Sequence, residues 1–198
     1  MFQSASTRRC RENAEAALHS KKAGTQCLCL FVFLFSLALT PAARAQTNKP
    51  LDVVPEGFDF KGNWSCAGTF RNNRVHLSTF TGAVILAGKW LELTETDVEP
   101  ATGYVAKYLI GYDPQQKQLV EFDANNFGAA TYSSAEGWVN HVLTMTSPVS
   151  AEGKPAYVAN RFLYSISGAD TFTIDWQISK TAALEWTTAD HLVCKRQP

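Results

Sequence analysis

The feature that most constrains this chain is a series of short segments in which apolar and polar residues alternate. In residues 104–112, for example, Tyr104, Ala106, Tyr108 and Ile110 occupy every second position. Side chains at positions i and i+2 point to the same face of a strand, so each such segment predicts a strand with one apolar and one wet face. About ten segments follow this pattern, with turn residues between them and no helical period; they are 63–70, 75–85, 89–98, 104–112, 117–123, 127–133, 138–146, 156–167, 171–179 and 184–194. The sequence predicts an all-β fold.

Two cysteines indicate how these strands are arranged. Cys66 lies in the first predicted strand and Cys194 in the last. A disulfide needs Cα atoms within about 7 Å of each other, so a bridge between them would make the two terminal strands neighbours. This favours an up-and-down antiparallel barrel, which also removes unpaired sheet edges. A sandwich with the same bridge, or two free buried thiols, are the alternatives.

The first 45 residues are typical of an export signal. Residues 28–39 are apolar and uncharged, Lys21 and Lys22 precede them, and Ala43-Arg44-Ala45 follows. The apolar run is shorter than the roughly 20 residues that span a bilayer, and the flanks fit a cleaved secretory signal peptide. We therefore expect a signal peptide over 1–45, cleavage after Ala45, a periplasmic or secreted protein and no stable membrane anchor afterwards. An uncleaved anchor is the alternative.

The remaining chain divides into an extended lead-in over 46–56, which contains Pro50 and Pro55, and a barrel domain over 57–198. Residues 46–198 hold 12 basic and 16 acidic side chains. Nucleic-acid binding needs clustered Lys and Arg against phosphates, so this mildly acidic domain argues against a nucleic-acid partner.

Several motifs resemble the calycin-like barrels, which comprise lipocalins, fatty-acid-binding proteins and nitrobindins. Phe58-Asp59-Phe60 and Gly62-Asn63-Trp64 open the first predicted strand, and Lys195-Arg196 closes the last. Gly111-Tyr112-Asp113-Pro114 and Glu136-Gly137-Trp138 add a resemblance to an uncharacterised family of exported bacterial barrels. The resemblance implies structural roles for Gly62, Trp64 and Arg196, with Trp64 plugging one barrel end and Arg196 packed over it.

The resulting hypothesis is an exported lipocalin-like barrel that binds a small apolar or amphipathic molecule. Inward aromatic residues would line its cavity, with one histidine as a polar contact; these residues are Tyr108, Phe162, Tyr164, Trp176 and His141. The alternative, from another class, is a filled barrel that acts through its outer surface as a structural or interaction protein of the cell envelope. A protein partner therefore stays open.

A lower alternative is haem binding, which the nitrobindin resemblance implies through a histidine near the chain end. Here that residue is His191. If Trp64, Cys66 and Cys194 point inward, alternation turns His191 outward, away from any cavity. We predict no cofactor.

Metal binding and catalysis find little support in the sequence. Val75 and Leu77 suggest that His76 between them is exposed, and the acidic residues of 92–99 are typical of a solvated strand end. The histidines are far apart in the sequence, and none has a carboxylate residue at the close spacing typical of metal ligands. No nucleophile or metalloprotease motif occurs. We therefore expect no metal site and no catalytic residues.

Overall fold

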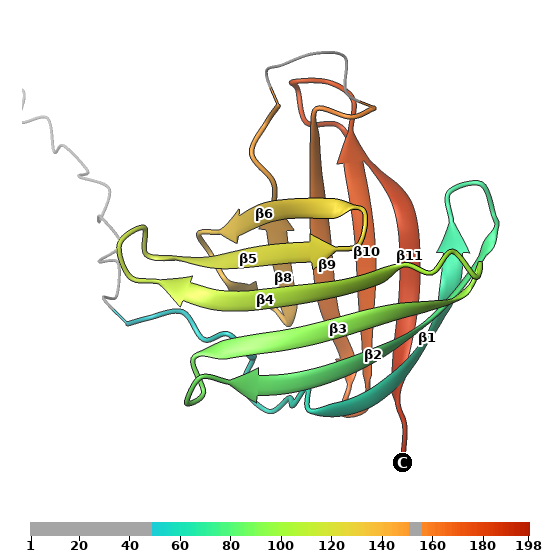
Figure 1. Ribbon diagram of the computed structural model, residues 1–198. Helices are drawn as coiled ribbons and strands as arrows, with labels where there is room; N and C mark the ends of the chain where they lie inside the picture. Colours follow the sequence, from blue (N-terminus) through green and yellow to red (C-terminus); the bar gives the residue numbers. More distant parts are fainter. Residues whose placement is uncertain (1–48, 151–155) are drawn as a thin grey trace, which may run out of the picture. The chain divides into compact units, whose positions relative to one another are not determined.

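The computed structural model describes residues 49–150 and 156–198, and in that part of the chain every regular element is a strand (Figure 1). The signal peptide expected over 1–45 lies outside the described residues. A membrane-crossing helix is not found among the residues that the structure describes. The strands are β1 (Gly62–Phe70), β2 (Val75–Ile85), β3 (Trp90–Glu99), β4 (Val105–Asp113), β5 (Gln118–Asn125), β6 (Gly128–Ser134), β7 (Trp138–Val139), β8 (Val142–Thr146), β9 (Ala159–Gly168), β10 (Thr171–Ser179) and β11 (Trp186–Arg196).

The strands form one antiparallel sheet that closes on itself. Along the sheet the order is β6-β5-β4-β3-β2-β1-β11-β10-β9-β8-β7, and β6 also pairs with β8 through Ser133 and Thr146. This last pairing closes ten strands into a barrel and leaves β7 as a short extra strand beside β8. The predicted all-β, up-and-down antiparallel barrel is confirmed.

A disulfide joins the first and last strands. Cys66 of β1 and Cys194 of β11 lie opposite each other, with Cα atoms 4.0 Å apart. Both side chains are buried inside the barrel. The predicted bridge is therefore present. It links the first and last strands, β1 and β11, which lie side by side in the sheet (Figure 1).

One predicted strand is divided in two. Residues 138–146 form β7 and β8 because Asn140 and His141 both adopt positive φ, 50° and 65°. Two successive residues with positive φ make the tight turn that joins two antiparallel strands. The turn carries Asn-His instead of the usual Asn-Gly, and this explains why the sequence did not indicate it.

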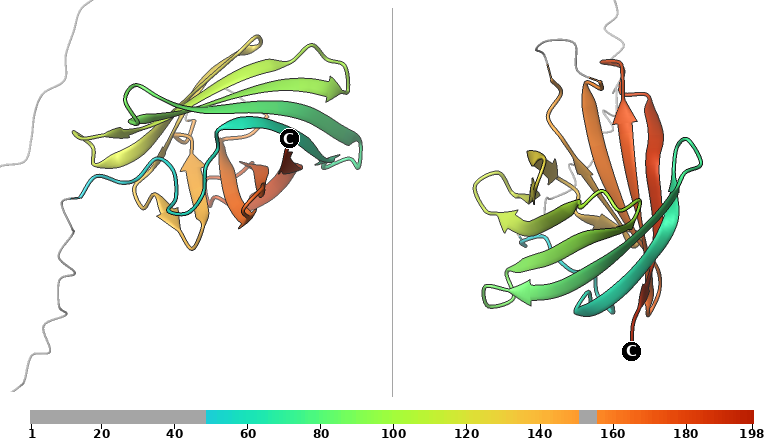
Figure 2. Two further views of the ribbon diagram at one scale, coloured as in Figure 1. Left: turned by 90° about the horizontal axis from the view of Figure 1, so that it is seen from below. Right: turned by 45° about the vertical axis from the view of Figure 1, so that its right-hand side comes forward.

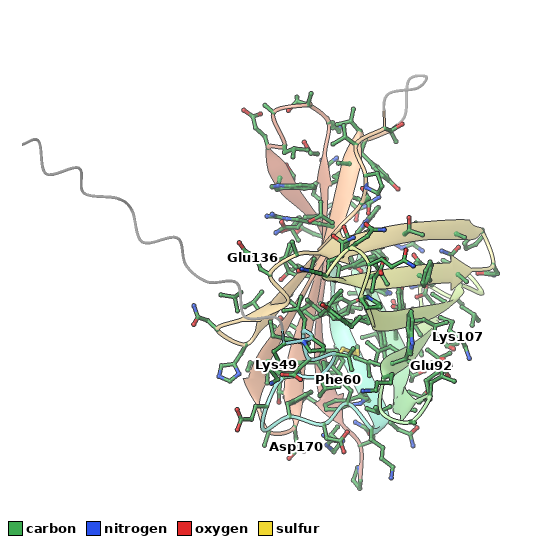
Figure 3. The ribbon with its side chains drawn as sticks, turned by 90° about the vertical axis from the view of Figure 1, so that its left-hand side faces the viewer. Lys49, Phe60, Glu92, Lys107, Glu136 and Asp170 are labelled. Carbon is green, nitrogen blue, oxygen red and sulfur yellow. A yellow bond between two sulfur atoms is a disulfide. The ribbon has the colours of Figure 1, made fainter. Side chains whose placement is uncertain are left out.

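Residues 49–61, which precede β1, cover one end of the barrel (Figure 2). Phe58 and Phe60 pack against Trp64 and Phe172, with ring centroids 4.8–6.4 Å apart. The Trp64 indole N–H donates to the carbonyl of Phe60 at 2.9 Å. Figure 3 shows Phe60 among the interior side chains, whereas Glu92 and Lys107 form an ion pair at 3.1 Å on the outside. We call this plugged region the closed end.

Arg196 completes the closed end. Its guanidinium lies 4.3 Å from the centroid of the Trp64 ring and donates to the carbonyls of Asp59 and Lys61. Gly62 has a φ of 113°, a conformation that side-chain-bearing residues rarely adopt. Gly62, Trp64 and Arg196 thus lie together at the closed end.

Candidate functional site at the open end of the barrel

The opposite end of the barrel contains a cavity of about 530 Å³. Its lining comes from the end of β3, the start of β4 and the start of β11, among others, and these positions lie at the end away from Trp64. We call this region the open end. Its cavity has two chemically different walls.

The first wall is a polar cluster around His76, which comes from the start of β2. Its Nδ1 lies 2.8 Å from Oδ2 of Asp190, and its Nε2 lies 3.1 Å from Oδ1 of Asp97 and 3.9 Å from Oε1 of Glu95. Tyr108 donates a hydrogen bond of 2.6 Å to Oε2 of Glu95. We call these five residues the His76 cluster.

The cluster is held within the barrel wall. His76 is 4% exposed and Glu95 is 5% exposed. The Phe70 ring stacks on the imidazole at a centroid distance of 4.4 Å, and Thr102 donates to Oδ2 of Asp97 at 2.8 Å. These contacts fix the orientation of the imidazole and of the Asp97 carboxylate.

The surrounding charges change the protonation of His76. Burial alone lowers the pKa of an imidazole, but the hydrogen bond and negative charge of Asp190, together with Asp97 and Glu95, outweigh burial and raise the pKa of His76 to about 9. His76 is therefore a cation at neutral pH. Its hydrogen-bonding partners among the described residues are carboxylates, so it does not activate a hydroxyl or thiol nucleophile there.

Burial acts in the opposite direction on the acid beside it. Burial raises the pKa of Glu95 to about 7, although the Tyr108 hydrogen bond and the charge of His76 both lower it. Burial also raises the pKa of the Tyr108 hydroxyl well above its ordinary value, so Tyr108 remains a hydrogen-bond donor. The cluster can hold or exchange a proton and can attract a cation.

The second wall is aromatic. Phe162 of β9 is its centre, because its ring makes edge contacts with Tyr108 and Tyr132 at centroid distances of 5.8 and 5.2 Å. Trp176 and Tyr157 extend this wall with a centroid distance of 5.8 Å between their rings. Phe162 and Trp176 are only half-buried, so apolar surface is available inside the cavity.

A separate buried acid lies within the barrel. Glu121 of β5 is fully buried, and its Oε2 accepts a hydrogen bond of 3.2 Å from the Tyr164 hydroxyl. Its Oε1 has no hydrogen-bond partner among the described residues. Burial raises the pKa of Glu121 to about 8, so this side chain is protonated at neutral pH.

Most of the predicted ligand-binding residues lie together. Tyr108, Phe162 and Trp176 line the cavity, and Tyr164 packs behind Phe162 with a centroid distance of 6.2 Å. His141 differs from the expectation, because it is exposed in the turn between β7 and β8 and does not line the cavity. The turn ends the alternation that had suggested an inward position.

The sequence prediction was wrong about His76. It is buried and Val75 is 45% exposed, because the inward phase of β2 is set by Phe80 and Gly82 further along the strand. The prediction that the acidic residues of 92–99 form a solvated strand end was also wrong in part. Glu95 and Asp97 share the inward phase of Leu91 and Leu93, whereas Glu92 lies on the outer face and Glu99 is exposed at the strand end.

This finding removes the reason for expecting no metal ligands. His76, Glu95 and Asp97 present potential ligand atoms within 4.8 Å of one another. The residues are far apart in the sequence, and pairing of β2 with β3 brings them together. Their shared inward phase with Phe80 and with Leu93 is the signal that could have identified them.

His191 lies where the strand alternation indicates. It is on the outer face of β11, its side chain is 43% exposed, and its Nδ1 is 2.8 Å from Oδ1 of Asp175. Neither residue lines the open-end cavity. The histidine that the nitrobindin resemblance suggests for haem is thus turned away from the interior.

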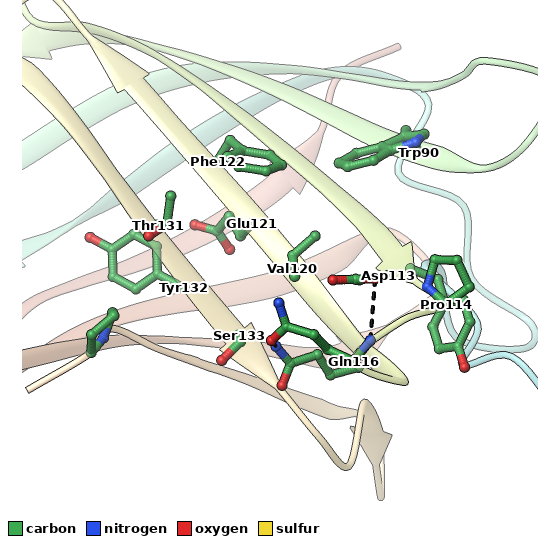
Figure 4. Close-up of a pocket in the computed structure, with 13 residues that line it drawn as sticks. Trp90, Asp113, Pro114, Gln116, Val120, Glu121, Phe122, Thr131, Tyr132 and Ser133 are labelled. Atoms are coloured by element: carbon green, nitrogen blue, oxygen red, sulfur yellow. Dashed lines mark hydrogen bonds between the residues drawn. The ribbon is translucent and has the colours of Figure 1, made fainter.

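A second hollow of about 620 Å³ lies beside β5 and the β4–β5 turn (Figure 4). The rings of Trp90 and Phe122 stack at 6.1 Å along its edge, and Phe122 is 47% exposed. Gln116 and Asp113 contribute the polar part, linked by a hydrogen bond of 3.3 Å. The lining of this outer groove includes the buried carboxyl of Glu121, but among the described residues it has no cluster of ionisable groups like the one around His76. The open end is therefore the stronger candidate site.

The sequence matches no protein-family model and no curated protein.

Proposed function

We propose that the protein binds a small amphipathic molecule in the open-end cavity. The observation that carries this proposal is the contrast between the two cavity walls. The aromatic wall around Phe162 suits an apolar moiety, and the His76 cluster suits a polar or charged group. A volume of about 530 Å³ is within the range of small-molecule sites.

Export forms part of this proposal. The apolar run over 28–39 and the Ala43-Arg44-Ala45 sequence favour cleavage after Ala45 and release to the periplasm or exterior. The disulfide between Cys66 and Cys194 is compatible with an oxidising compartment. Mass measurement of the mature protein, purified from its host, tests the cleavage site directly.

Native mass spectrometry of the same material is the first test of ligand binding. A small molecule retained in the cavity is expected as a discrete added mass that disappears on denaturation. If the purified protein carries no bound molecule, its cavity is titrated with N-phenyl-1-naphthylamine. This neutral amphipathic probe becomes more fluorescent in apolar surroundings.

The variants for this titration separate the cavity from the outer groove. Phe162→Ala removes the central ring of the aromatic wall, so the probe is expected to bind about tenfold more weakly. Ala130→Trp places a bulky ring in the lining of the cavity and is expected to block the probe. Phe122→Ala, on the outer face, is the matched control and should leave the affinity unchanged. Equal binding by all three variants, or none by the wild type, would contradict the proposal.

The second candidate function is a protein that acts through its outer surface. The outer groove beside Trp90 and Phe122 favours it, because both rings present apolar area outside the barrel. Under this alternative, native mass spectra would contain a complex with another protein and no small molecule. Phe122→Ala, and not Phe162→Ala, would then dissociate the complex.

A further inference from the structure

The His76 cluster has the geometry of a metal site. The ligand atoms are Nε2 of His76, Oδ1 of Asp97 at 3.1 Å and Oε1 of Glu95 at 3.9 Å, and all three fall within 4.8 Å of one another. A tetrahedral ion with bonds of about 2.0–2.1 Å keeps its ligand atoms roughly 3.3 Å apart. The His76–Asp97 pair is already close to this spacing, and the Glu95 carboxylate would have to move by roughly 0.6–1.5 Å to join them around one ion.

The cluster also has more negative than positive groups. Three carboxylates, those of Glu95, Asp97 and Asp190, surround a single imidazole, and the residues that line the cavity include no Lys or Arg. Oδ1 of Asp190 is buried without a partner in the described part of the chain. Oε1 of Glu95 likewise accepts no hydrogen bond from a described residue, although the side chain is 5% exposed. A metal ion bound between these oxygens would offset the excess of negative charge in the cluster.

Asp190 occupies the place of an orienting partner. Its Oδ2 accepts a hydrogen bond of 2.8 Å from Nδ1 of His76. In protein metal sites a carboxylate on one ring nitrogen fixes the tautomer that leaves the other nitrogen free to bind the ion. With Nδ1–H held by Asp190, Nε2 faces Asp97 and Glu95, and a metal ion bound there would take the place of the proton on Nε2.

We propose that His76, Glu95 and Asp97 bind one divalent transition-metal ion of the Zn²⁺ class, with Asp190 orienting His76. The imidazole favours such an ion over Ca²⁺, which takes six to eight oxygen ligands. An organic ammonium group would not fit between ligand atoms 3.1 Å apart. Because these residues line the open-end cavity, the remaining coordination position faces the space in which a ligand would lie.

The test uses the mature, disulfide-bonded protein after treatment with EDTA and its removal. Isothermal titration with Zn²⁺ should give one ion per chain, and Co²⁺ should give the visible absorption of a protein-bound ion. His76→Ala and Asp97→Asn each remove a ligand, and each is expected to weaken Zn²⁺ binding at least 100-fold. Asp97→Asn preserves the shape of the side chain, so it remains informative if His76→Ala does not fold.

His191→Ala is the matched control, because His191 also contacts an aspartate but lies on the outer face. It should bind Zn²⁺ like the wild type. Failure of the wild-type protein to bind one equivalent would overturn the proposal, and so would undiminished binding by Asp97→Asn. The probe titration with the metal-free protein is a separate measurement, so loss of one of the two binding activities leaves the other interpretable.

Discussion

The two ends of this barrel are built from different chemistry. At the closed end Phe60, Trp64 and Phe172 fill the interior, and the polar atoms of Trp64 and Arg196 find backbone partners. At the open end the inward positions carry His76 and Glu95, and the barrel encloses a cavity instead of side chains. The same strands contribute to both ends, so their composition changes along their length.

This difference suggests that one end of the sheet stabilises the fold and the other end is suited to binding. Tightly packed aromatic side chains stabilise a fold because they bury large apolar areas and leave few voids. Buried ionisable groups and open space reduce stability, and proteins commonly retain them where they bind or react. We therefore expect changes at the closed end to affect stability and changes at the open end to affect binding.

The largest effect is expected from the disulfide beside the closed end. Replacing Cys66 and Cys194 together by Ser removes a cross-link between residues separated by 128 positions. Chain-entropy arithmetic gives a loss of about 5 kcal/mol in the free energy of unfolding. Urea denaturation followed by fluorescence measures this loss. An unchanged midpoint would show that the strands need no covalent link.

A slightly smaller effect is expected from Trp64→Ala. Trp64 is 1% exposed, and its truncation leaves a cavity between Phe58 and Phe172, so the free energy of unfolding should fall by about 4 kcal/mol. Binding of the naphthylamine probe by the folded fraction should stay the same. A variant that loses probe affinity while folded would refute the separation between the two ends.

The pH dependence of stability tests the buried acid Glu121. The pKa of Glu121 is about 8 in the folded protein against 4.5 for the ordinary side chain, so folding retains a proton that the unfolded chain releases. Stability from this group is complete below about pH 4.5 and is lost as the pH rises toward 8. The loss between pH 5 and pH 7 is about 2 kcal/mol.

Glu121→Gln keeps the shape of the side chain and removes the titration. Subtracting its unfolding curves from those of the wild type isolates Glu121 from Glu95, whose raised pKa of about 7 acts in the same direction. The variant should be the more stable protein at pH 8. Parallel curves for the two proteins would mean that Glu121 keeps its ordinary pKa.

The smallest effect is expected from Arg196→Ala. The guanidinium contacts the Trp64 ring from a partly exposed position, with 27% of the side chain accessible. Loss of the cation–π contact, of the hydrogen bonds to the Asp59 and Lys61 carbonyls and of the exposed ion pair with Asp170 should together cost about 1–2 kcal/mol of unfolding free energy. Arg196→Lys tests whether charge alone suffices, since Lys cannot reproduce the hydrogen bonds to Asp59 and Lys61. Thermal unfolding resolves both differences.

The barrel fold and its closed end could be predicted from the sequence because their signals are local and regular. Alternation in residues 104–112 identified a strand and its buried face, and the position of Cys66 and Cys194 in the outermost strands indicated which strands meet. The resemblance to calycin-like barrels added the pairing of Trp64 with Arg196. One strand boundary was missed where Asn140 and His141 adopt positive φ without a glycine.

The polar wall of the open end could not be predicted from the sequence, because its signals are neither local nor regular. His76 and Glu95 are polar residues on inward positions, so they interrupt the alternation of apolar and polar residues that identifies the inward face of a strand. The ligand atoms also come from separate strands, and only strand register brings β2 and β3 into contact at these positions. The aromatic residues Phe162 and Trp176 were recognised because they keep the apolar phase.

The strand pairing that closes the barrel differs in extent from one pair of strands to another. β1 and β11 are paired from Trp64 to Phe70 and linked by a disulfide, whereas β6 and β8 meet at the single pair of Ser133 and Thr146. The ring can therefore widen most easily between β6 and β8, with little loss of backbone hydrogen bonding. Because β6 also carries Tyr132 into the cavity, a separation of β6 from β8 would enlarge the cavity on that side, while the disulfide-linked pair of β1 and β11 on the other side would keep its register.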